Sequence, residues 1–319
     1  MTDAETHAYA RQTGGEAITL ARVTRRYGDT VAVRDLSFAV ARGEMFGLIG
    51  PDGAGKTTTI RIICGLLRPD GGSVRVLGLD PVREHRRLTA SVGYLSQRFS
   101  LYGDLSIDEN IAFFAEIHGV RDYRGRRDRL LDLTQLTPFR GRLADRLSGG
   151  MRQKLALACT LIHEPSLIVL DEPTTGVDPL SRREFWKLLS EFLSQGITIV
   201  MATPYLDEAE RCSRVALLYQ GGLLALDTPA ALNRSMPGAL YELIVGDHRR
   251  AAAILRAIEE VGDVQMFGDR VHVRLARNDA AALERIAQRL RGAGIDIRSV
   301  RPIATSLEDV FITRLHEAS

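Results

Sequence analysis

A glycine-rich segment that ends in lysine and threonine has the residue types needed to bind phosphate groups. It reads Gly50-Pro-Asp-Gly-Ala-Gly-Lys-Thr57 and fits the spacing G-x-x-x-x-G-K-[ST]. Glycines let backbone N–H groups turn inward around a phosphate, and a helix N-terminus adds positive potential. Lys56 would reach the β- and γ-phosphates, and the Thr57 hydroxyl would bind Mg²⁺. A glycine-rich turn with a chance Lys-Thr is the alternative. The predicted phosphate contacts are Gly50, Pro51, Asp52, Gly53, Ala54, Gly55, Lys56, Thr57 and Thr58.

Two adjacent carboxylates follow a short apolar run, Leu167-Ile-Val-Leu-Asp171-Glu172. An uninterrupted apolar run of this length indicates a strand that is buried on both faces of a parallel sheet. The carboxyl ends of such strands face the ligand crevice. Asp171 would hold Mg²⁺ directly or through water, and Glu172 would act as general base on an attacking water. The alternative is an ordinary surface Asp-Glu pair before the turn at Pro173.

A second anion site is predicted at Leu147-Ser-Gly-Gly-Met-Arg-Gln153, which precedes the helical run Lys154–Ile162. A serine and two glycines at a helix start leave backbone N–H groups free to face an anion. A glycine-bearing helix cap without a ligand is the alternative interpretation.

The elements that must position these residues alternate between strand and helix. Strands are expected at Ile18–Val23, Val33–Val40, Glu44–Gly50, Val74–Leu77, Val92–Leu95, Leu167–Asp171 and Ile197–Met201, and helices at Lys56–Leu67 and Leu180–Leu193. This alternation predicts an α/β fold with a mostly parallel sheet. Ser106-Ile-Asp-Glu109 has capping-box spacing, and residues 105–158 are expected to be mostly helical, so a helical insert interrupts the sheet.

The composition becomes turn-like over Thr228–Gly238, which predicts a boundary between domains 17–236 and 237–319. The second domain reads strand, helix, strand, strand, helix, strand, a split-βαβ pattern typical of a ferredoxin-like α+β fold. Its two middle strands would form a hairpin around Gly268-Asp269. A last helix is expected at Ser306–His316.

The overall composition is that of an ordinary globular protein. The 319 residues carry a net charge of +2, which gives no argument for a nucleic-acid partner. Cys64, Cys159 and Cys212 are far apart, which favours free thiols in a reducing cytosol. Residues 1–16 are expected to form a disordered tail, since they lack the order of a signal peptide. No apolar run approaches the roughly 20 residues needed to span a bilayer.

Together these motifs closely resemble the ATP-binding-cassette (ABC) ATPase family, whose signature matches Leu147–Gln153. The resemblance covers about residues 18–232. It implies the P-loop ATPase cassette fold, with an antiparallel β subdomain and a helical insert at about 98–160. It also implies ATP and Mg²⁺ as ligands. In this family the signature of one subunit caps the γ-phosphate held by another, so a second cassette is an expected partner.

The same resemblance implies functional roles for residues outside these motifs. Tyr27 matches an aromatic that stacks on adenine, with an ordinary strand aromatic as the alternative. Gln97 matches a glutamine that contacts Mg²⁺ and water, and Gly176-Val-Asp178 matches a loop that crosses the dimer interface. The expected catalytic residues are therefore Glu172, Lys56 and Gln97, and the expected metal ligands are Thr57, Gln97 and Asp171. The expected signature and interface contacts to nucleotide are Ser148, Gly149, Gly150, Gln153 and Asp178.

The stretch Arg98–Gly119 and the C-terminal Ser306-Leu-Glu-Asp-Val-Phe311 are similar to the ABC-2 type exporter ATPases of the daunorubicin and multidrug kind. This likeness implies a peripheral position at the cytoplasmic face of a membrane and an integral membrane partner. A short helix of that partner would dock beside Gln97 and Tyr102. The basic run Arg121–Arg129 is either a solvated face or a contact with lipid headgroups or the membrane partner. A non-transport ABC ATPase and a P-loop kinase or GTPase are competing hypotheses.

One position departs from the family pattern. Pro204 stands where the family usually has a histidine that donates to the γ-phosphate, and proline has neither a side-chain donor nor a backbone N–H. A neighbouring group or water could substitute, so that hydrolysis is only slowed. Alternatively the site is degenerate and the intact signature completes the site of a different partner cassette. Both hypotheses stay open from the sequence.

Overall fold

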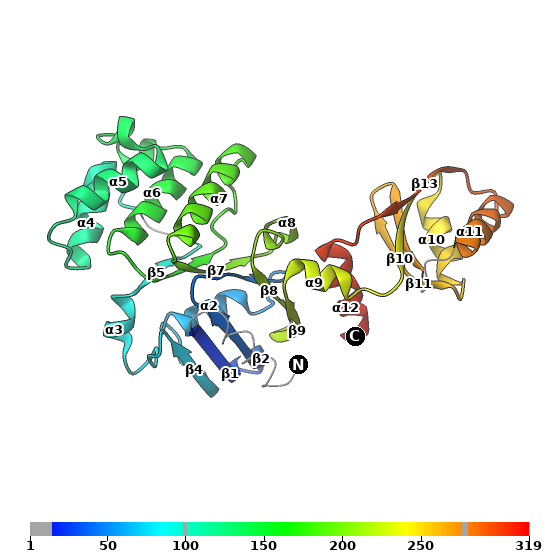
Figure 1. The fold of residues 1–319 in the computed structure, drawn as a ribbon, viewed down its shortest axis with the longest axis horizontal. Helices are drawn as coiled ribbons and strands as arrows, with labels where there is room; N and C mark the ends of the chain where they lie inside the picture. The colour runs from blue at the N-terminus through cyan, green and yellow to red at the C-terminus, as the bar shows by residue number, and fades with distance from the viewer. Residues whose placement is uncertain (1–14, 98–100, 276–279, 319) are drawn as a thin grey trace. The chain divides into compact units, whose positions relative to one another are not determined.

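The computed structural model describes residues 15–97, 101–275 and 280–318, which fall into two compact units, Met1–Thr228 and Pro229–Ser319 (Figure 1). The contacts thus place residues 229–236 with the second unit, whereas the sequence assigned them to the first. Residues 1–14 of the expected N-terminal tail lie outside the described residues. Glu16, also assigned to that tail, begins strand β1 by pairing with Ala41.

A six-stranded sheet forms the centre of the first unit, in the order β5-β6-β7-β3-β8-β9. Its strands are parallel except for β9, which pairs antiparallel with β8. Every residue of β3, β6 and β7 is buried, as expected for strands covered on both faces. Strands β8 and β9, which extend the sheet beyond β3, were not predicted from the sequence. The strand bounds are β5 Val92–Leu95, β6 Leu167–Asp171, β7 Thr198–Thr203, β3 Met45–Ile49, β8 Arg214–Tyr219 and β9 Gly222–Asp227.

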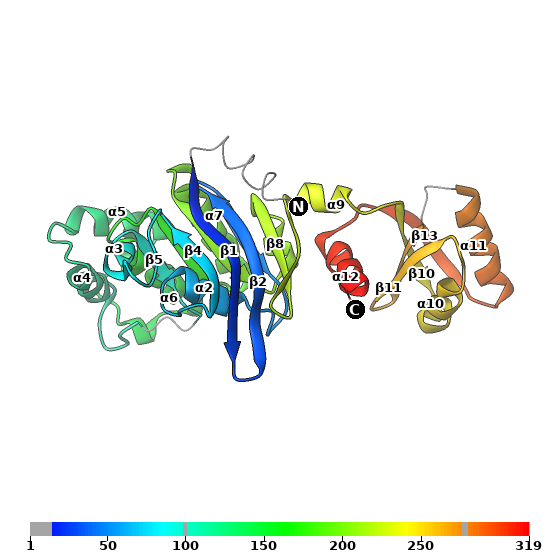
Figure 2. The same cartoon turned by 90° about the horizontal axis from the view of Figure 1, so that it is seen from below.

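Three further strands form an antiparallel sheet in the order β2-β1-β4, seen side by side in Figure 2. Their bounds are β1 Glu16–Tyr27, β2 Thr30–Ala41 and β4 Gly71–Val76. Helix α2 (Lys56–Ile63) contributes to one apolar core together with residues of both sheets. It ends four residues before the predicted Leu67. Gly65 adopts φ 69°, and the N–H groups of Gly65 and Leu66 bond back to Ile62 and Arg61, a Schellman ending.

The predicted helical insert is present between β5 and β6. Its first helix begins with the predicted capping box: Ser106 accepts from the Glu109 N–H, and the Glu109 carboxylate accepts from the Ser106 N–H. Arg98, Phe99 and Ser100, at the expected start of the insert, lie outside the described residues. The insert and neighbouring helices are α3 His85–Thr89, α4 Ile107–Ile117, α5 Arg124–Thr134, η1 Thr137–Phe139, η2 Ala144–Arg146, α6 Gly149–Leu161, α7 Pro179–Ser194 and α8 Leu206–Ala209.

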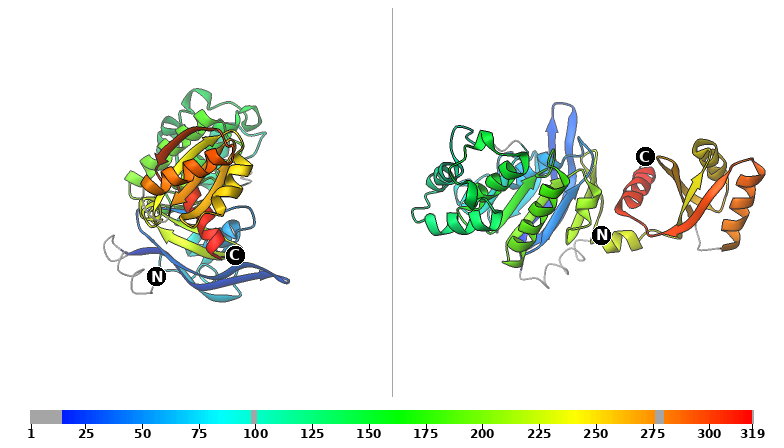
Figure 3. Two further views of the ribbon diagram at one scale, coloured as in Figure 1. Left: turned by 90° about the vertical axis from the view of Figure 1, so that its right-hand side faces the viewer. Right: turned by 90° about the horizontal axis from the view of Figure 1, so that it is seen from above.

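The second unit has the predicted β-α-β-β-α-β order, and its sheet runs β11-β12-β10-β13, all antiparallel. Helices α10 and α11 pack against this sheet (Figure 3), and their apolar residues share a core with those of its strands. The hairpin of β11 and β12 turns at Gly268-Asp269, as predicted. The bounds are α9 Pro229–Arg234, β10 Ala239–Val245, α10 His248–Arg256, β11 Val261–Phe267, β12 Arg270–Leu275, α11 Ala280–Gly292, β13 Ile297–Ile303 and α12 Leu307–Ala318.

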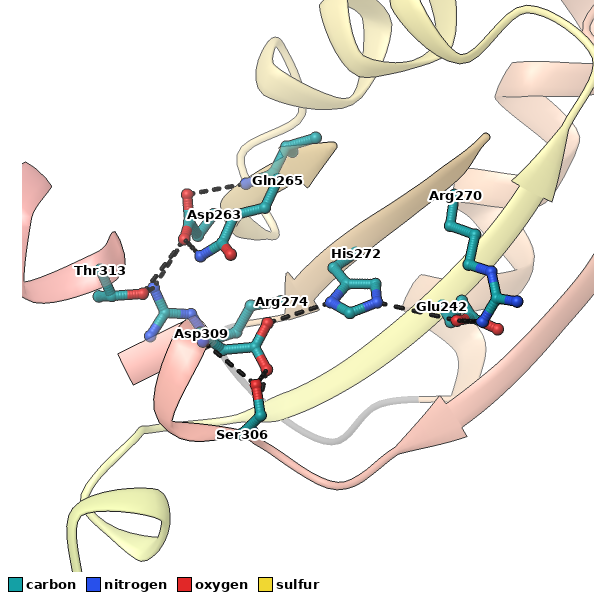
Figure 4. Close-up of polar contacts among 10 residues, drawn as sticks. Glu242, Asp263, Gln265, Arg270, His272, Arg274, Ser306, Asp309 and Thr313 are labelled. Atoms are coloured by element: carbon teal, nitrogen blue, oxygen red, sulfur yellow. Dashed lines mark hydrogen bonds and ion pairs between the residues drawn. The ribbon is translucent and has the colours of Figure 1, made fainter. Parts of the chain in front are cut away.

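Polar contacts attach α12 to this sheet (Figure 4). The His272 ring lies between two carboxylates, with Nδ1 3.1 Å from Asp309 and Nε2 3.8 Å from Glu242. Arg274 donates to the Thr313 hydroxyl at 3.1 Å.

Within the described ranges, no helix is both long and apolar enough to cross a bilayer. The three cysteines are free, as predicted, and the structure buries all of them.

Candidate functional site

The phosphate loop joins β3 to α2, and two of its glycines are required by close packing. A Cβ at Gly50 would lie 2.3 Å from the Leu218 carbonyl oxygen, and one at Gly55 would lie 2.4 Å from that of Ala32. Gly55 also has φ 96°, a conformation that favours glycine. Side chains at these positions would therefore displace the loop from β2 and β8.

Lys56, the first residue of α2, turns back over this loop. Its side chain is 4% exposed, and Nζ donates to the carbonyl oxygens of Gly50 at 2.8 Å and Pro51 at 3.1 Å. The same ammonium lies 3.4 Å from Glu172 Oε1. Because the loop carbonyls are neutral acceptors, the ammonium could exchange them for the anionic oxygens of a ligand in the loop.

Thr57 and Asp171 meet although they are 114 residues apart, with Thr57 Oγ1 donating to Asp171 Oδ1 at 3.0 Å. A hydroxyl and a carboxylate are the hard oxygen ligands that Mg²⁺ prefers. Burial raises the pKa of Asp171 and the nearby Glu172 carboxylate adds to this, against the hydrogen bond from Thr57. The buried Asp171 carboxylate accepts its hydrogen bond from a neutral hydroxyl. A divalent cation bound there would compensate its charge, so Thr57 and Asp171 fit such an ion.

Glu172 lies at the point where the other site residues converge. Its Oε2 accepts from Gln97 Nε2 at 3.0 Å, and its side chain is 10% exposed. The Thr175 hydroxyl lies 3.4 Å from the same oxygen. The structure thus brings together three residues expected to be catalytic: Glu172 and Gln97, which follow β6 and β5, and Lys56 at the start of α2.

The signature begins α6, with Ser148 as the N-cap that accepts from the Met151 N–H at 3.2 Å. Ser148 and Gly149 are exposed. Gly150 is buried, and a Cβ there would lie 2.2 Å from Ser181 Oγ, so glycine permits the close approach of α6 to α7. Asp178 caps α7, and hydrogen bonds from Ser181 and Leu180 lower its pKa.

Among the described contacts, none joins Ser148, Gly149 or Gln153 to the phosphate loop. The exposed start of α6 is therefore not covered by the phosphate loop of its own chain.

Tyr27 ends β1 and is 46% exposed. The Arg25 guanidinium lies 5.0 Å from the centre of its ring, and Arg25 in turn pairs with Asp70 at 2.6 Å. One face of the ring is therefore supported by a cation–π contact.

Pro204 lies in the loop after β7. Glu208, in the short helix α8 that follows this loop, was not among the residues predicted from the sequence. Glu208 is 1% exposed and accepts hydrogen bonds from Thr174 and Thr203. These two threonines flank the loops of Glu172 and Pro204. The sequence signal was weak, because Glu208 is one of three acids in Asp207-Glu-Ala-Glu210.

An apolar cavity of about 230 Å³ lies between α2, α3, β5, α4 and α6. Phe114, Leu66 and Tyr94 line it together with the histidines His118 and His163. Those two rings stack at 3.9 Å. Tyr102, 45% exposed, packs edge-on against Phe113, the neighbour of Phe114. Leu66 and Ile117 are also more than half exposed, so this face presents apolar surface.

Comparisons with known proteins agree with this geometry. Residues 33–175 match the family model described as ABC transporter. The chain is 42% identical over 305 residues to the probable multidrug ABC transporter ATP-binding protein YbhF of Escherichia coli, covering 93% of this chain. The chain spans only 52% of that relative's length.

A second relative matches along nearly its whole length. The daunorubicin resistance ATP-binding protein DrrA2 of Streptomyces coeruleorubidus is 34% identical over 305 residues, which cover 93% of this chain and 94% of the relative. A solved dimeric structure of a bacterial ABC transporter cassette is 26% identical. Its TM-score is 0.58, and the match covers 66% of this chain and 98% of that one.

Proposed function

Because this chain belongs to the family of ABC transporter ATP-binding subunits, we propose that it binds Mg·ATP at the phosphate loop and hydrolyses it to drive a membrane-embedded partner. The proposal depends on one observation, which is that the predicted site residues meet around Glu172. Lys56 and Gln97 contact its carboxylate, and Thr57 bonds to the adjacent Asp171. These residues place a cation that can bind phosphate, two candidate metal ligands and a candidate base close to one another.

In this proposal each side chain has a separate task. The backbone of Gly50–Lys56 and the N-terminus of α2 bind the phosphates. Lys56 Nζ exchanges its loop carbonyls for the β- and γ-phosphate oxygens. Thr57 and Asp171 hold Mg²⁺, which supplies charge stabilisation at the transferred phosphoryl group. Glu172 accepts a proton from the attacking water, and Gln97 orients Glu172 through its amide.

The exposed signature supports a proposal of two cassettes. Ser148, Gly149, Gly150 and Gln153 would cap a nucleotide held by the phosphate loop of a second cassette, with Asp178 at the interface. The chain has one phosphate loop and one signature, so two sites require two chains. The dimeric cassette to which this chain is similar supports the same arrangement.

The partner in the membrane would be a permease subunit that docks a short helix beside Gln97 and Tyr102. Tyr102, which is 45% exposed and packs against Phe113, offers aromatic surface for such a contact. We place the protein at the cytoplasmic face of the membrane. The direction is export, because the relatives are described as multidrug and daunorubicin resistance proteins. Nucleic acid is not proposed as a partner.

Pro204 supports a second candidate, a degenerate cassette that serves mainly as the partner half of a heterodimer. Mg-dependent ATP hydrolysis by the purified chain separates the two, measured beside Glu172→Gln and Pro204→His. We expect the wild type to hydrolyse ATP and Glu172→Gln to lose about 10²-fold or more in kcat. A wild type near background that Pro204→His activates would instead establish the degenerate cassette.

A further inference from the structure

Glu208 is a buried carboxylate that joins three segments behind the proposed site. Its Oε1 accepts from the Thr174 hydroxyl at 2.6 Å, and its Oε2 accepts from the Thr203 hydroxyl at 2.7 Å. Arg182 of α7 places its Nε 3.7 Å from Oε1. With 1% of the residue exposed, these contacts replace the water that the charge has lost.

Each threonine belongs to a loop at the carboxyl end of a central strand. Thr174 comes two residues after Glu172, and Thr203 directly precedes Pro204. Both are buried, with 1% and 0% exposure. The Thr203 hydroxyl also accepts from the Tyr205 N–H at 3.1 Å, so it fixes the turn that contains Pro204. Through these hydrogen bonds, the Glu208 carboxylate connects the loop that contains Glu172 to the loop that contains Pro204.

Glu172 needs such support because its backbone is strained. Its φ is 52°, in the left-handed region that non-glycine residues rarely occupy. Its N–H donates to the Ala202 carbonyl at 2.9 Å, which again ties it to the end of β7. A conformation of this kind persists only where the surroundings hold it.

Pro204 makes this support more important. It offers no side-chain donor and no N–H to a phosphate or a water. The Arg182 guanidinium stacks over the next residue, Tyr205, at 4.8 Å from the ring centre. The polar groups of this loop are thus directed toward Glu208 and α7.

We infer that Glu208 is a positioning residue for hydrolysis, which acts by holding Thr174 against Thr203 and so fixes the orientation of Glu172. It does not contact the substrate, and the inference rests on the proposed ATPase function. A carboxylate is suited to this task because it accepts from both hydroxyls at once, with one oxygen for each.

The test compares the steady-state kinetics of the wild type and Glu208→Ala, together with binding of a fluorescent ATP analogue. We expect kcat to fall about 10- to 100-fold, since small displacements of a catalytic group have effects of this size. The KM for ATP and the affinity for the analogue should stay within about twofold, because the phosphate loop makes no contact with Glu208 among the described residues.

Two variants serve as matched controls. Glu210→Ala removes an exposed carboxylate that follows the same helix. Glu44→Ala removes another buried carboxylate, 6% exposed and paired with Arg214 at 3.4 Å, just before β3 at the opposite end of the sheet. Both should keep the wild-type kcat, although Glu44→Ala should lower stability. Unchanged kcat in a folded Glu208→Ala would overturn the inference.

A double-mutant cycle separates positioning from general damage. If Glu208 acts through Glu172, then Glu172→Gln combined with Glu208→Ala should be no slower than Glu172→Gln alone. If the kcat of the double variant falls below that of Glu172→Gln by the same factor that Glu208→Ala costs the wild type, the inference is overturned. If Glu208→Ala fails to fold, Thr174→Val provides the same comparison with an isosteric change, and unchanged kcat there has the same meaning. An inactive wild type would contradict the proposed function itself, whereas an active wild type with unaffected variants contradicts only the role of Glu208.

Discussion

Both units contain buried carboxylates, but the partners of these carboxylates differ in kind. In the cassette, Asp171 faces a threonine hydroxyl, and Glu172 faces an amide and a lysine that also binds loop carbonyls. In the second unit, Glu242 is fixed between Arg301 at 2.8 Å and Arg270 at 3.0 Å. The first set of partners can be exchanged for a ligand, whereas the second set already balances the charge.

The pKa shifts of the two groups have opposite directions for the same reason. Burial raises the pKa of Asp171, and the hydrogen bond from Thr57 and the charges of Arg61 and Lys56 offset this only in part. Hydrogen bonds from Arg301, followed by those from Arg270, lower the pKa of Glu242. Asp171, whose hydrogen-bond partner is a neutral hydroxyl, is thus open to a ligand, whereas Glu242, held by two arginines, makes a structural contact.

The largest expected effect comes from exchanging one acid of each set for its amide. Asp171→Asn should reduce Mg-dependent ATP hydrolysis about 10²-fold or more, because a metal supplies several kcal/mol of charge stabilisation to the transition state. Glu242→Gln should leave kcat within about twofold, since its contacts are to Arg301 and Arg270 of the second unit. Equal losses in the two variants would contradict the distinction between the sets. ATPase assays over a range of Mg²⁺ concentrations provide the measurement.

A smaller effect is expected on stability. Glu242→Ala should lower the free energy of unfolding by about 1–2 kcal/mol, because it removes two charge-assisted hydrogen bonds from arginines that are partly exposed and can regain water. Asp269→Ala, whose carboxylate is 79% exposed and 3.9 Å from Arg270, should change it by less than about 0.5 kcal/mol. Urea unfolding followed by far-UV circular dichroism checks both. Trp186, the single tryptophan, reports the cassette separately by fluorescence.

The smallest effect is a pH dependence of opposite sign in the two units. A raised pKa in the folded state means that ionised Asp171 destabilises the protein at neutral pH, and this penalty is relieved as pH falls through the folded pKa. The lowered pKa of Glu242 means that its stabilisation is present above its unfolded pKa of about 4.3 and is lost as pH falls through the folded value.

The corresponding measurement is the unfolding free energy of the wild type minus that of Asp171→Asn and of Glu242→Gln, as a function of pH. The first difference should become more favourable to the wild type as pH is lowered, and the second should shrink below about pH 4. Two differences that move in the same direction would show that the two carboxylates are not distinct in their environment.

The prediction from sequence was most complete where a local pattern specifies the structure. The predicted features include the phosphate loop, the capping box of α4, the hairpin at Gly268-Asp269 and the succession of strands and helices along the second unit. All of them depend on residues that are near one another in the chain. Strands β8 and β9 were missed. The boundary between the units was placed later than the contacts place it. These features depend on which surfaces pack together.

The sequence by itself determined which chemical groups this protein carries, because phosphate and Mg²⁺ chemistry needs glycine, lysine, threonine and carboxylate at fixed spacings. Only the tertiary structure decided which of these groups meet. Gln97 and Glu172 are 75 residues apart, and the sheet brings them within a hydrogen bond. Likewise, Glu208 is one acid among three in its run, and only burial behind β6 and β7 distinguishes it. Local spacing encodes the chemistry of a residue, whereas its partners follow from strands that pair across long intervals of the chain.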